Sequence, residues 1–222
     1  MRPLRIALTK GRLEEKTVAL LESLGFDCGA LREKGRKLIL PVTGKNGEQL
    51  EAVLAKAADV ITYVENGVCD LGVVGKDTIL ENGTSFYEIT DLGFGRCRFA
   101  VAAKAGEDPY EGYGQLRVAT KYPKVARRFF EQKGMDVDVI KIEGSVELAP
   151  LLGLSDVIVD IVETGATLRE NGLAVIEDVA HISARLIANV ASLKLRKQEI
   201  EALTTQIESA VSLRQEKRKA EA

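Results

Sequence analysis

Short apolar runs and helical stretches alternate along the chain, and this alternation constrains its fold more than any other feature. Residues 4–9 form an apolar run, and residues 13–24 follow with apolar positions at helical spacing. Further runs predict strands at residues 38–42, 71–74, 99–103, 116–120, 137–142, 157–162 and 184–190. Strands that alternate with helices predict an α/β fold with a largely parallel sheet.

We expect two lobes. Lobe I comprises residues 1–93 and 179–222, and lobe II comprises residues 94–178. Glycines at 93 and 95 mark the first crossing. The apolar strand at 184–190 then returns to the first lobe.

The tail, residues 194–222, reads as one amphipathic helix. Ile200, Leu203, Ile207 and Val211 recur at steps of three and four residues, with charged residues between them. This apolar face packs either on its own lobe or on a partner subunit. The charged end, residues 214–222, is expected to fray.

Charge and residue counts exclude several classes of protein. The formal net charge is −2, whereas a general nucleic-acid binder needs a broad excess of Lys and Arg. The first apolar run is broken at once by Lys10 and Arg12, which argues against a signal peptide. No apolar run approaches the roughly 18 residues that span a bilayer. Three cysteines without CxxC spacing predict free thiols, so we expect a cytoplasmic protein that does not contact membranes or nucleic acid.

The segment 156–172 carries the clearest chemical signal. An apolar strand ends near Asp160 and Glu163, and the turn Thr164-Gly165-Ala166-Thr167 then opens a helix. Glycine permits close approach of the backbone, and unpaired amides at a helix start favour an anion. The acids could accept hydrogen bonds from ribose hydroxyls. The alternative is that a threonine only caps the helix. The acids at the strand end favour a phosphate loop, which resembles the phosphoribosyl pyrophosphate loop of phosphoribosyltransferases.

Other segments extend this resemblance over residues 4–190. Residues 9–13 read Thr-Lys-Gly-Arg-Leu, residues 70–77 read Asp-Leu-Gly-Val-Val-Gly-Lys-Asp, and residues 144–150 read Gly-Ser-Val-Glu-Leu-Ala-Pro. With Arg-Lys-Leu-Ile at 36–39 and Tyr-Val-Glu-Asn-Gly at 63–67, the chain resembles the ATP phosphoribosyltransferases. The resemblance implies a two-lobed fold like that of type II periplasmic binding proteins, with the active site in the cleft. It also implies transfer of the phosphoribosyl group of phosphoribosyl pyrophosphate to N1 of ATP with Mg²⁺, at the head of histidine biosynthesis.

The resemblance also implies partners. The chain stops after the tail helix and so is similar to the short form of the family, which lacks a histidine-binding domain. Short forms work with a regulatory subunit that resembles a histidyl-tRNA synthetase, as a homodimer within a hetero-octamer. Two positions depart from the family pattern, since Ile61 stands where proline is expected and Lys56 where arginine is common. Lysine keeps the charge of arginine but loses its planar fork, which weakens the expected phosphate contact at Lys56.

The reaction requires positioning and charge stabilisation, because a neutral adenine nitrogen displaces a highly charged pyrophosphate. Arg12 and Arg36 are the candidate catalytic residues, since a guanidinium grips phosphate oxygens in paired hydrogen bonds. Mg²⁺ would be held mainly by substrate oxygens. The candidate substrate-binding residues are Lys10, Gly11, Lys56, Glu147, Asp160, Glu163, Thr164, Gly165, Ala166, Thr167 and Leu168.

Two other functions stay open on the sequence. A solute receptor or the effector domain of a transcription regulator can share the same fold, although neither class needs the loop at residues 160–167. A phosphoribosyltransferase with another acceptor base would share that loop, but the earlier motifs count against it.

Overall fold

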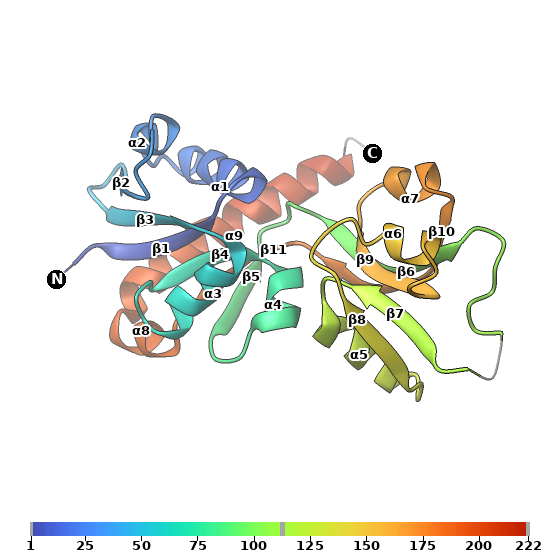
Figure 1. The fold of residues 1–222 in the computed structure, drawn as a ribbon. Coiled ribbons are helices and arrows are strands. Elements are labelled where there is room, and N and C mark those ends of the chain that lie inside the picture. Colours follow the sequence, from blue (N-terminus) through green and yellow to red (C-terminus); the bar gives the residue numbers. More distant parts are fainter. Residues whose placement is uncertain (1, 112–113, 221–222) are drawn as a thin grey trace. The chain divides into compact units, whose positions relative to one another are not determined.

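The structure is a computed structural model, and it describes residues 2–111 and 114–220. The chain forms two compact units (Figure 1). Unit 1 comprises Met1–Gly95 with Ser183–Ala222, and unit 2 comprises Arg96–Ile182.

Unit 1 is built on a six-stranded sheet in the order β2-β3-β1-β4-β11-β5. Its strands are β1 (Leu4–Thr9), β2 (Ile39–Thr43), β3 (Gln49–Ala55), β4 (Leu71–Gly75), β5 (Tyr87–Asp91) and β11 (Ala184–Ala188). Its helices are α1 (Arg12–Ser23), α2 (Gly29–Arg32), α3 (Ala57–Glu65), α4 (Lys76–Asn82), α8 (Val190–Leu195) and α9 (Lys197–Ala220). Alternate strand residues form two cores, one shared with α1, α2 and α9 and the other with α3.

Unit 2 is built on a five-stranded sheet in the order β10-β6-β9-β7-β8. Its strands are β6 (Cys97–Lys104), β7 (Leu116–Thr120), β8 (Val137–Lys141), β9 (Val157–Val162) and β10 (Leu173–Ile182). Its helices are α5 (Pro123–Gln132), α6 (Leu148–Leu151) and α7 (Ala166–Glu170). Small residues such as Ala100, Ala102 and Ala119 line the core under α6 and α7, so these short helices pack close to the sheet.

The expected largely parallel sheet is wrong, because both sheets are mixed. β3, β1 and β4 run parallel, but β2, β11 and β5 join them by antiparallel pairing. In unit 2, β8, β7 and β9 run parallel, while β6 and β10 are antiparallel. The parallel strands lie in the middle of the first sheet and on one side of the second sheet, and the motifs follow their carboxyl ends.

The two crossings between the units lie later in the chain than residues 93 and 178. β10 pairs with β6 along its whole length, up to Ile182 opposite Cys97, so the second unit continues to Ile182. Asp91 fastens both crossing segments to unit 1: its Oδ1 accepts hydrogen bonds from the Gly93 amide and from the Ser183 hydroxyl, each at 2.8 Å. β11 then lies between β4 and β5 in the first sheet.

The tail helix α9 packs on unit 1. Its four apolar positions, Ile200, Leu203, Ile207 and Val211, are buried in the core shared with β1 and α1. The expected fraying from residue 214 is wrong at that residue, because Nη2 of Arg214 donates to Oγ of Ser23 at 2.9 Å, and α9 continues to Ala220. Residues 221 and 222 lie outside the described part of the chain.

Asp70 joins both chain ends to the first sheet. This carboxylate is 1% exposed and precedes β4. It accepts hydrogen bonds from the Arg2 guanidinium at 2.6 and 3.0 Å, the Arg5 amide at 2.8 Å, the Ser192 hydroxyl at 2.8 Å and the Arg196 guanidinium at 3.1 Å. Burial alone would raise the pKa of Asp70, but the hydrogen bonds from Arg2, the Arg5 amide and Ser192 outweigh it and lower the pKa. These contacts give Asp70 a structural role.

Candidate functional site

Two lysines follow neighbouring parallel strands of the first sheet. Thr9 at the end of β1 is in register with Ala55 at the end of β3, and the Lys10 amide donates to the Ala55 carbonyl at 3.0 Å. Lys10 and Lys56 therefore leave the same edge of the sheet, and both are exposed. This is the carboxyl edge, where open α/β sheets bind their ligands.

Gly11 turns the chain from β1 into α1. Its φ of 93° and ψ of −141° form a conformation that is open to glycine and strained for other residues. The N-cap position of α1 makes no side-chain capping hydrogen bond. Arg12 begins the helix and is exposed at this edge.

Arg36 is carried by a turn between α2 and β2. The Lys37 amide donates to the Lys34 carbonyl at 2.9 Å, which closes the turn, and the Arg36 side chain is exposed. An ion pair between Lys34 and the buried carboxylate of Glu14 ties this turn to the first turn of α1. Since Arg12 lies two residues before Glu14, the two candidate arginines belong to segments that are held together.

The second group of residues follows the parallel strands of the second sheet. Thr120 ends β7 and is fully buried. Its hydroxyl donates to the Val159 carbonyl at 2.6 Å and accepts from the Tyr122 amide at 2.9 Å, and its carbonyl accepts from the Ile142 amide at 2.9 Å. These bonds fix the ends of β7, β8 and β9 side by side, so the loops after the three strands share one edge.

The loop after β9 is shaped by Gly165, which has φ 73° and ψ 10° in the left-handed region. The Thr164 hydroxyl accepts from the Ala166 amide at 3.3 Å, and the Thr164 carbonyl accepts from Nη1 of Arg169 at 3.0 Å. A Cβ on residue 165 would lie 3.2 Å from that same Nη1. The turn is therefore a defined structure that requires glycine and is braced by Arg169.

The structure changes the expected roles of several loop residues. Helix α7 has only five residues, so its dipole contributes less than the helix-start argument assumed. The Leu168 side chain is buried in the core of unit 2, so only its backbone amide can meet a substrate. Thr167 is exposed, and its amide and that of Leu168 belong to the first turn, which has no intrahelical acceptors. Glu163 is exposed at the end of the strand.

Asp160 and Glu147 meet at this edge although they lie on different segments. Asp160 is half-buried in β9, and Glu147 stands at the start of α6, where its side chain makes no capping bond. Burial raises the pKa of Asp160, the charge of Glu147 adds to the rise, and the Ile161 amide and the Lys121 charge oppose it. Ser145, at φ 47°, is the one non-glycine residue of the described chain with a positive φ, and this strain lies two residues before Glu147.

Comparison with known proteins decides the family. The family model described as ATP phosphoribosyltransferase matches residues 56–209. The chain is 52% identical over 211 residues to the ATP phosphoribosyltransferase of Clostridium kluyveri, with 95% of each protein covered. It is 55% identical over 207 residues to that of Alkaliphilus metalliredigens, with 93% of this chain and 97% of the relative covered. The chain belongs to the ATP phosphoribosyltransferase family.

Solved structures agree with this assignment. The chain is similar to a chain of the ATP phosphoribosyl transferase (HisG:HisZ) complex from Thermotoga maritima, with a TM-score of 0.77, 33% identity and 94% and 98% of the two chains covered. It also resembles the periplasmic aliphatic sulphonate binding protein SsuA from Escherichia coli, with a TM-score of 0.62, 15% identity and 99% and 76% covered. The second likeness concerns the fold alone, and it confirms the predicted two-lobed architecture of type II periplasmic binding proteins.

Membership in the ATP phosphoribosyltransferase family gives the chain its activity. It is an enzyme that transfers the 5-phosphoribosyl group of phosphoribosyl pyrophosphate to N1 of ATP and releases pyrophosphate, the first step of histidine biosynthesis. The predictions of an enzyme and of this reaction are confirmed. The alternatives of a solute receptor and of a phosphoribosyltransferase with another acceptor are set aside.

Sequence reasoning missed Lys121. This exposed lysine follows β7, and its charge affects both Asp160 and Glu143. Its signal was weak, because a single lysine between a strand and the Pro123 that opens a helix is common. Only the order of the strands places the end of β7, which Lys121 follows, between β8, which precedes the segment with Glu147, and β9, which contains Asp160.

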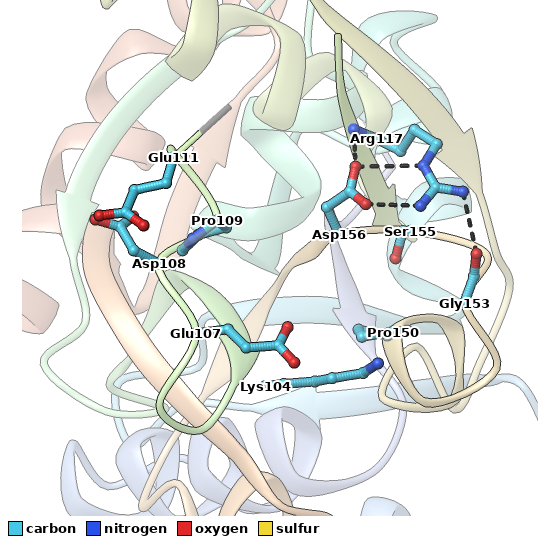
Figure 2. Close-up of a pocket in the computed structure, with 10 residues that line it drawn as sticks. All are labelled: Lys104, Glu107, Asp108, Pro109, Glu111, Arg117, Pro150, Gly153, Ser155 and Asp156. Atoms are coloured by element: carbon cyan, nitrogen blue, oxygen red, sulfur yellow. Dashed lines mark hydrogen bonds and ion pairs between the residues drawn. The ribbon is translucent and has the colours of Figure 1, made fainter. Parts of the chain in front are cut away.

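The second unit of the protein also has a cavity that is separate from the candidate residues of that unit (Figure 2). It measures about 250 Å³ and is lined by residues at the opposite edge of the second sheet, where β7 and β9 begin. There the Arg117 guanidinium donates to both carboxylate oxygens of Asp156, at 2.6 and 3.3 Å, and to the Gly153 carbonyl at 3.0 Å. None of the candidate residues lines this cavity, and we assign no substrate to it.

Three further facts concern the described residues. They contain no group of three or more His, Cys, Asp or Glu side chains that could hold a metal ion. Cys28, Cys69 and Cys97 are free thiols. No helix in the described part of the chain combines the length and the apolar composition needed to cross a membrane.

Proposed function

We propose that the loop after β9 binds the phosphoribosyl end of phosphoribosyl pyrophosphate. The observation that carries this proposal is the left-handed Gly165, through which the chain passes from the strand containing Asp160 to the start of α7, where the first-turn amides of Thr167 and Leu168 have no intrahelical acceptor. The amides of Thr167 and Leu168 and the hydroxyls of the two threonines donate to the 5′-phosphate. The contacting groups of the loop belong to Glu163, Thr164, Gly165, Ala166, Thr167 and Leu168.

The half-buried carboxylate of Asp160 accepts hydrogen bonds from the ribose hydroxyls. A charged acceptor makes stronger hydrogen bonds than a neutral one, so the carboxylate fixes the sugar most firmly when it is ionised. Glu147, from the neighbouring loop, lies close enough to affect the charge of Asp160 and contributes a second substrate contact. Both carboxylates also compensate the positive character that the ribose gains as the pyrophosphate leaves.

Arg12 and Arg36 grip the pyrophosphate. Each guanidinium can donate paired hydrogen bonds to phosphate oxygens, and the Lys34–Glu14 ion pair holds the two segments that carry them together. Lys10 and Lys56 add positive charge at the same edge, and Gly11 leaves the backbone open to a phosphate. These residues stabilise the charge that develops on the leaving group.

The chemistry then requires little acid–base work from the protein. N1 of adenine is uncharged and attacks the anomeric carbon as the bond to pyrophosphate breaks, so the enzyme contributes mainly alignment of the two substrates and stabilisation of charge. Mg²⁺ supplies neutralisation of the pyrophosphate oxygens, and it is carried mainly by the substrates themselves.

We also propose a regulatory partner. The Thermotoga maritima relative was solved as a HisG:HisZ complex, and the chain matches 98% of the chain it resembles there. This likeness supports a regulatory partner, and we propose that this partner is similar to a histidyl-tRNA synthetase and that the chain forms a homodimer within a hetero-octamer. The three free thiols fit a reducing compartment, so we place the assembly in the cytoplasm.

Kinetics of arginine variants test the pyrophosphate grip. Arg12→Ala and Arg36→Ala should each lower kcat/KM for phosphoribosyl pyrophosphate by at least about tenfold, since a charge-assisted hydrogen bond contributes roughly 1.5–3 kcal/mol. Arg127→Ala is the matched control, because Arg127 is exposed on α5 of unit 2 and has no assigned role. Unchanged kcat/KM in both test variants would remove the assignment.

A further inference from the structure

Lys121 occupies a central position at the carboxyl edge of the second sheet. β7 lies between β8 and β9, with Thr120 in register with Val159 of β9 and Lys141 of β8. Lys121 directly follows Thr120, as Asp160 directly follows Val159, so the two residues come next after the last paired positions of these neighbouring strands. The three hydrogen bonds of Thr120 fix the backbone on which Lys121 begins.

The neighbours of Asp160 show why the charge of Lys121 is relevant to this carboxylate. On the side away from β7, Asp160 faces Ala100 of β6, which carries no charge. The charge of Glu147 opposes the ionisation of Asp160, and the charge of Lys121 favours it. Lys121 also acts on Glu143, whose own ion pair is with Lys141 at 2.8 Å. Burial and the charge of Glu147 thus disfavour the charged form of this half-buried carboxyl, while the Ile161 amide and, to a smaller extent, the charge of Lys121 favour it.

We propose that Lys121 is a positioning residue for the transfer: its ammonium keeps the Asp160 carboxylate charged, so that this carboxylate can accept the ribose hydroxyls of phosphoribosyl pyrophosphate. The inference rests on the proposed role of Asp160. Lys121 acts through Asp160 and is not itself assigned a contact with the substrate.

The test is the dissociation constant of phosphoribosyl pyrophosphate, measured by calorimetry on the purified full chain across the weakly acidic to weakly alkaline range. Binding weakens in acid as Asp160 takes up a proton. In Lys121→Met the carboxyl loses its favourable charge, so this weakening should begin at a higher pH than in the unchanged chain, with binding unchanged on the alkaline side. Lys121→Arg keeps the charge and should restore the curve of the unchanged chain.

Lys104→Met is the matched control, because it removes the same charge from the same unit at the end of β6, where the residue lines the cavity of Figure 2. Its curve should overlie that of the unchanged chain. A Lys121→Met curve with no displacement, or with equal weakening at every pH, overturns the inference, since both results exclude an effect through Asp160. Asp160→Asn tests the role of Asp160 separately from that of Lys121. If this variant binds phosphoribosyl pyrophosphate normally, the proposed role of Asp160 is wrong.

Discussion

Replacing Gly165 by alanine tests whether the conformation of the loop after β9 controls binding of phosphoribosyl pyrophosphate. At φ 73° the new side chain is strained by about 1–2 kcal/mol. Its Cβ would also lie 3.2 Å from Nη1 of Arg169, which now donates to the Thr164 carbonyl at 3.0 Å. Arg169 is exposed and can move, so we discount the full value of that hydrogen bond. A tenfold rise in the dissociation constant, about 1.4 kcal/mol, is the expected result.

Gly172→Ala is a matched control at the other end of α7. Gly172 has φ 71°, so alanine there is strained to a similar degree, but a Cβ on it meets no atom within 4 Å. Both variants should lose similar thermal stability, and calorimetric titration should show weaker phosphoribosyl pyrophosphate binding only for Gly165→Ala. If the two variants bind it equally well, the reasoning that places the 5′-phosphate on this loop is refuted.

Two further predictions concern stability. Asp70→Asn should lower the free energy of unfolding by about 3 kcal/mol at pH 7 in urea denaturation, because it leaves Arg196 without its buried partner. The lowered pKa of Asp70 means that its stabilisation is present above the unfolded pKa of about 3.9 and is lost as the pH falls through the folded pKa, so the difference should shrink in acid; a constant difference would contradict this. Ile200→Ala should cost about 2–4 kcal/mol at a fully buried site, whereas Leu195→Ala, at a side chain 83% exposed, should cost under about 0.5 kcal/mol.

The sequence predicted the strands with mainly apolar runs well, including the edge strands β2 and β8, and missed strands whose apolar pattern is interrupted by polar residues. β1, β7 and β9 are continuous apolar runs that the structure shows at the expected residues. β5 and β10 were missed because they are edge strands in which half-exposed polar residues interrupt the apolar pattern. β3 was missed because alternation with Gln49 and Glu51 hides a strand that has one polar face. The largely parallel expectation failed because the predicted strands β11 and β6 pair antiparallel with β4 and β9, and because the missed strands β5 and β10 add further antiparallel pairs.

The candidate site also contains features that the sequence could predict and features that it could not. Motifs that directly continue a strand, such as Lys10-Gly11-Arg12 after β1 and the Gly165 turn after β9, could be read locally, because the residues that matter are adjacent in the chain. Contacts that depend on the order of strands could not be read. The ion pair that fastens the Arg36 turn to α1 and the position of Lys121 after a strand that neighbours the strand of Asp160 both join segments at least 20 residues apart.

The most direct test is formation of phosphoribosyl-ATP by the purified chain. ATP, phosphoribosyl pyrophosphate, Mg²⁺ and a pyrophosphatase are supplied, and the reaction is run with and without a regulatory subunit of the HisZ type. The account predicts product in at least one of these two reactions, and a rate at least about tenfold lower when Arg12 is replaced by alanine. Absence of product both with and without the subunit would contradict it.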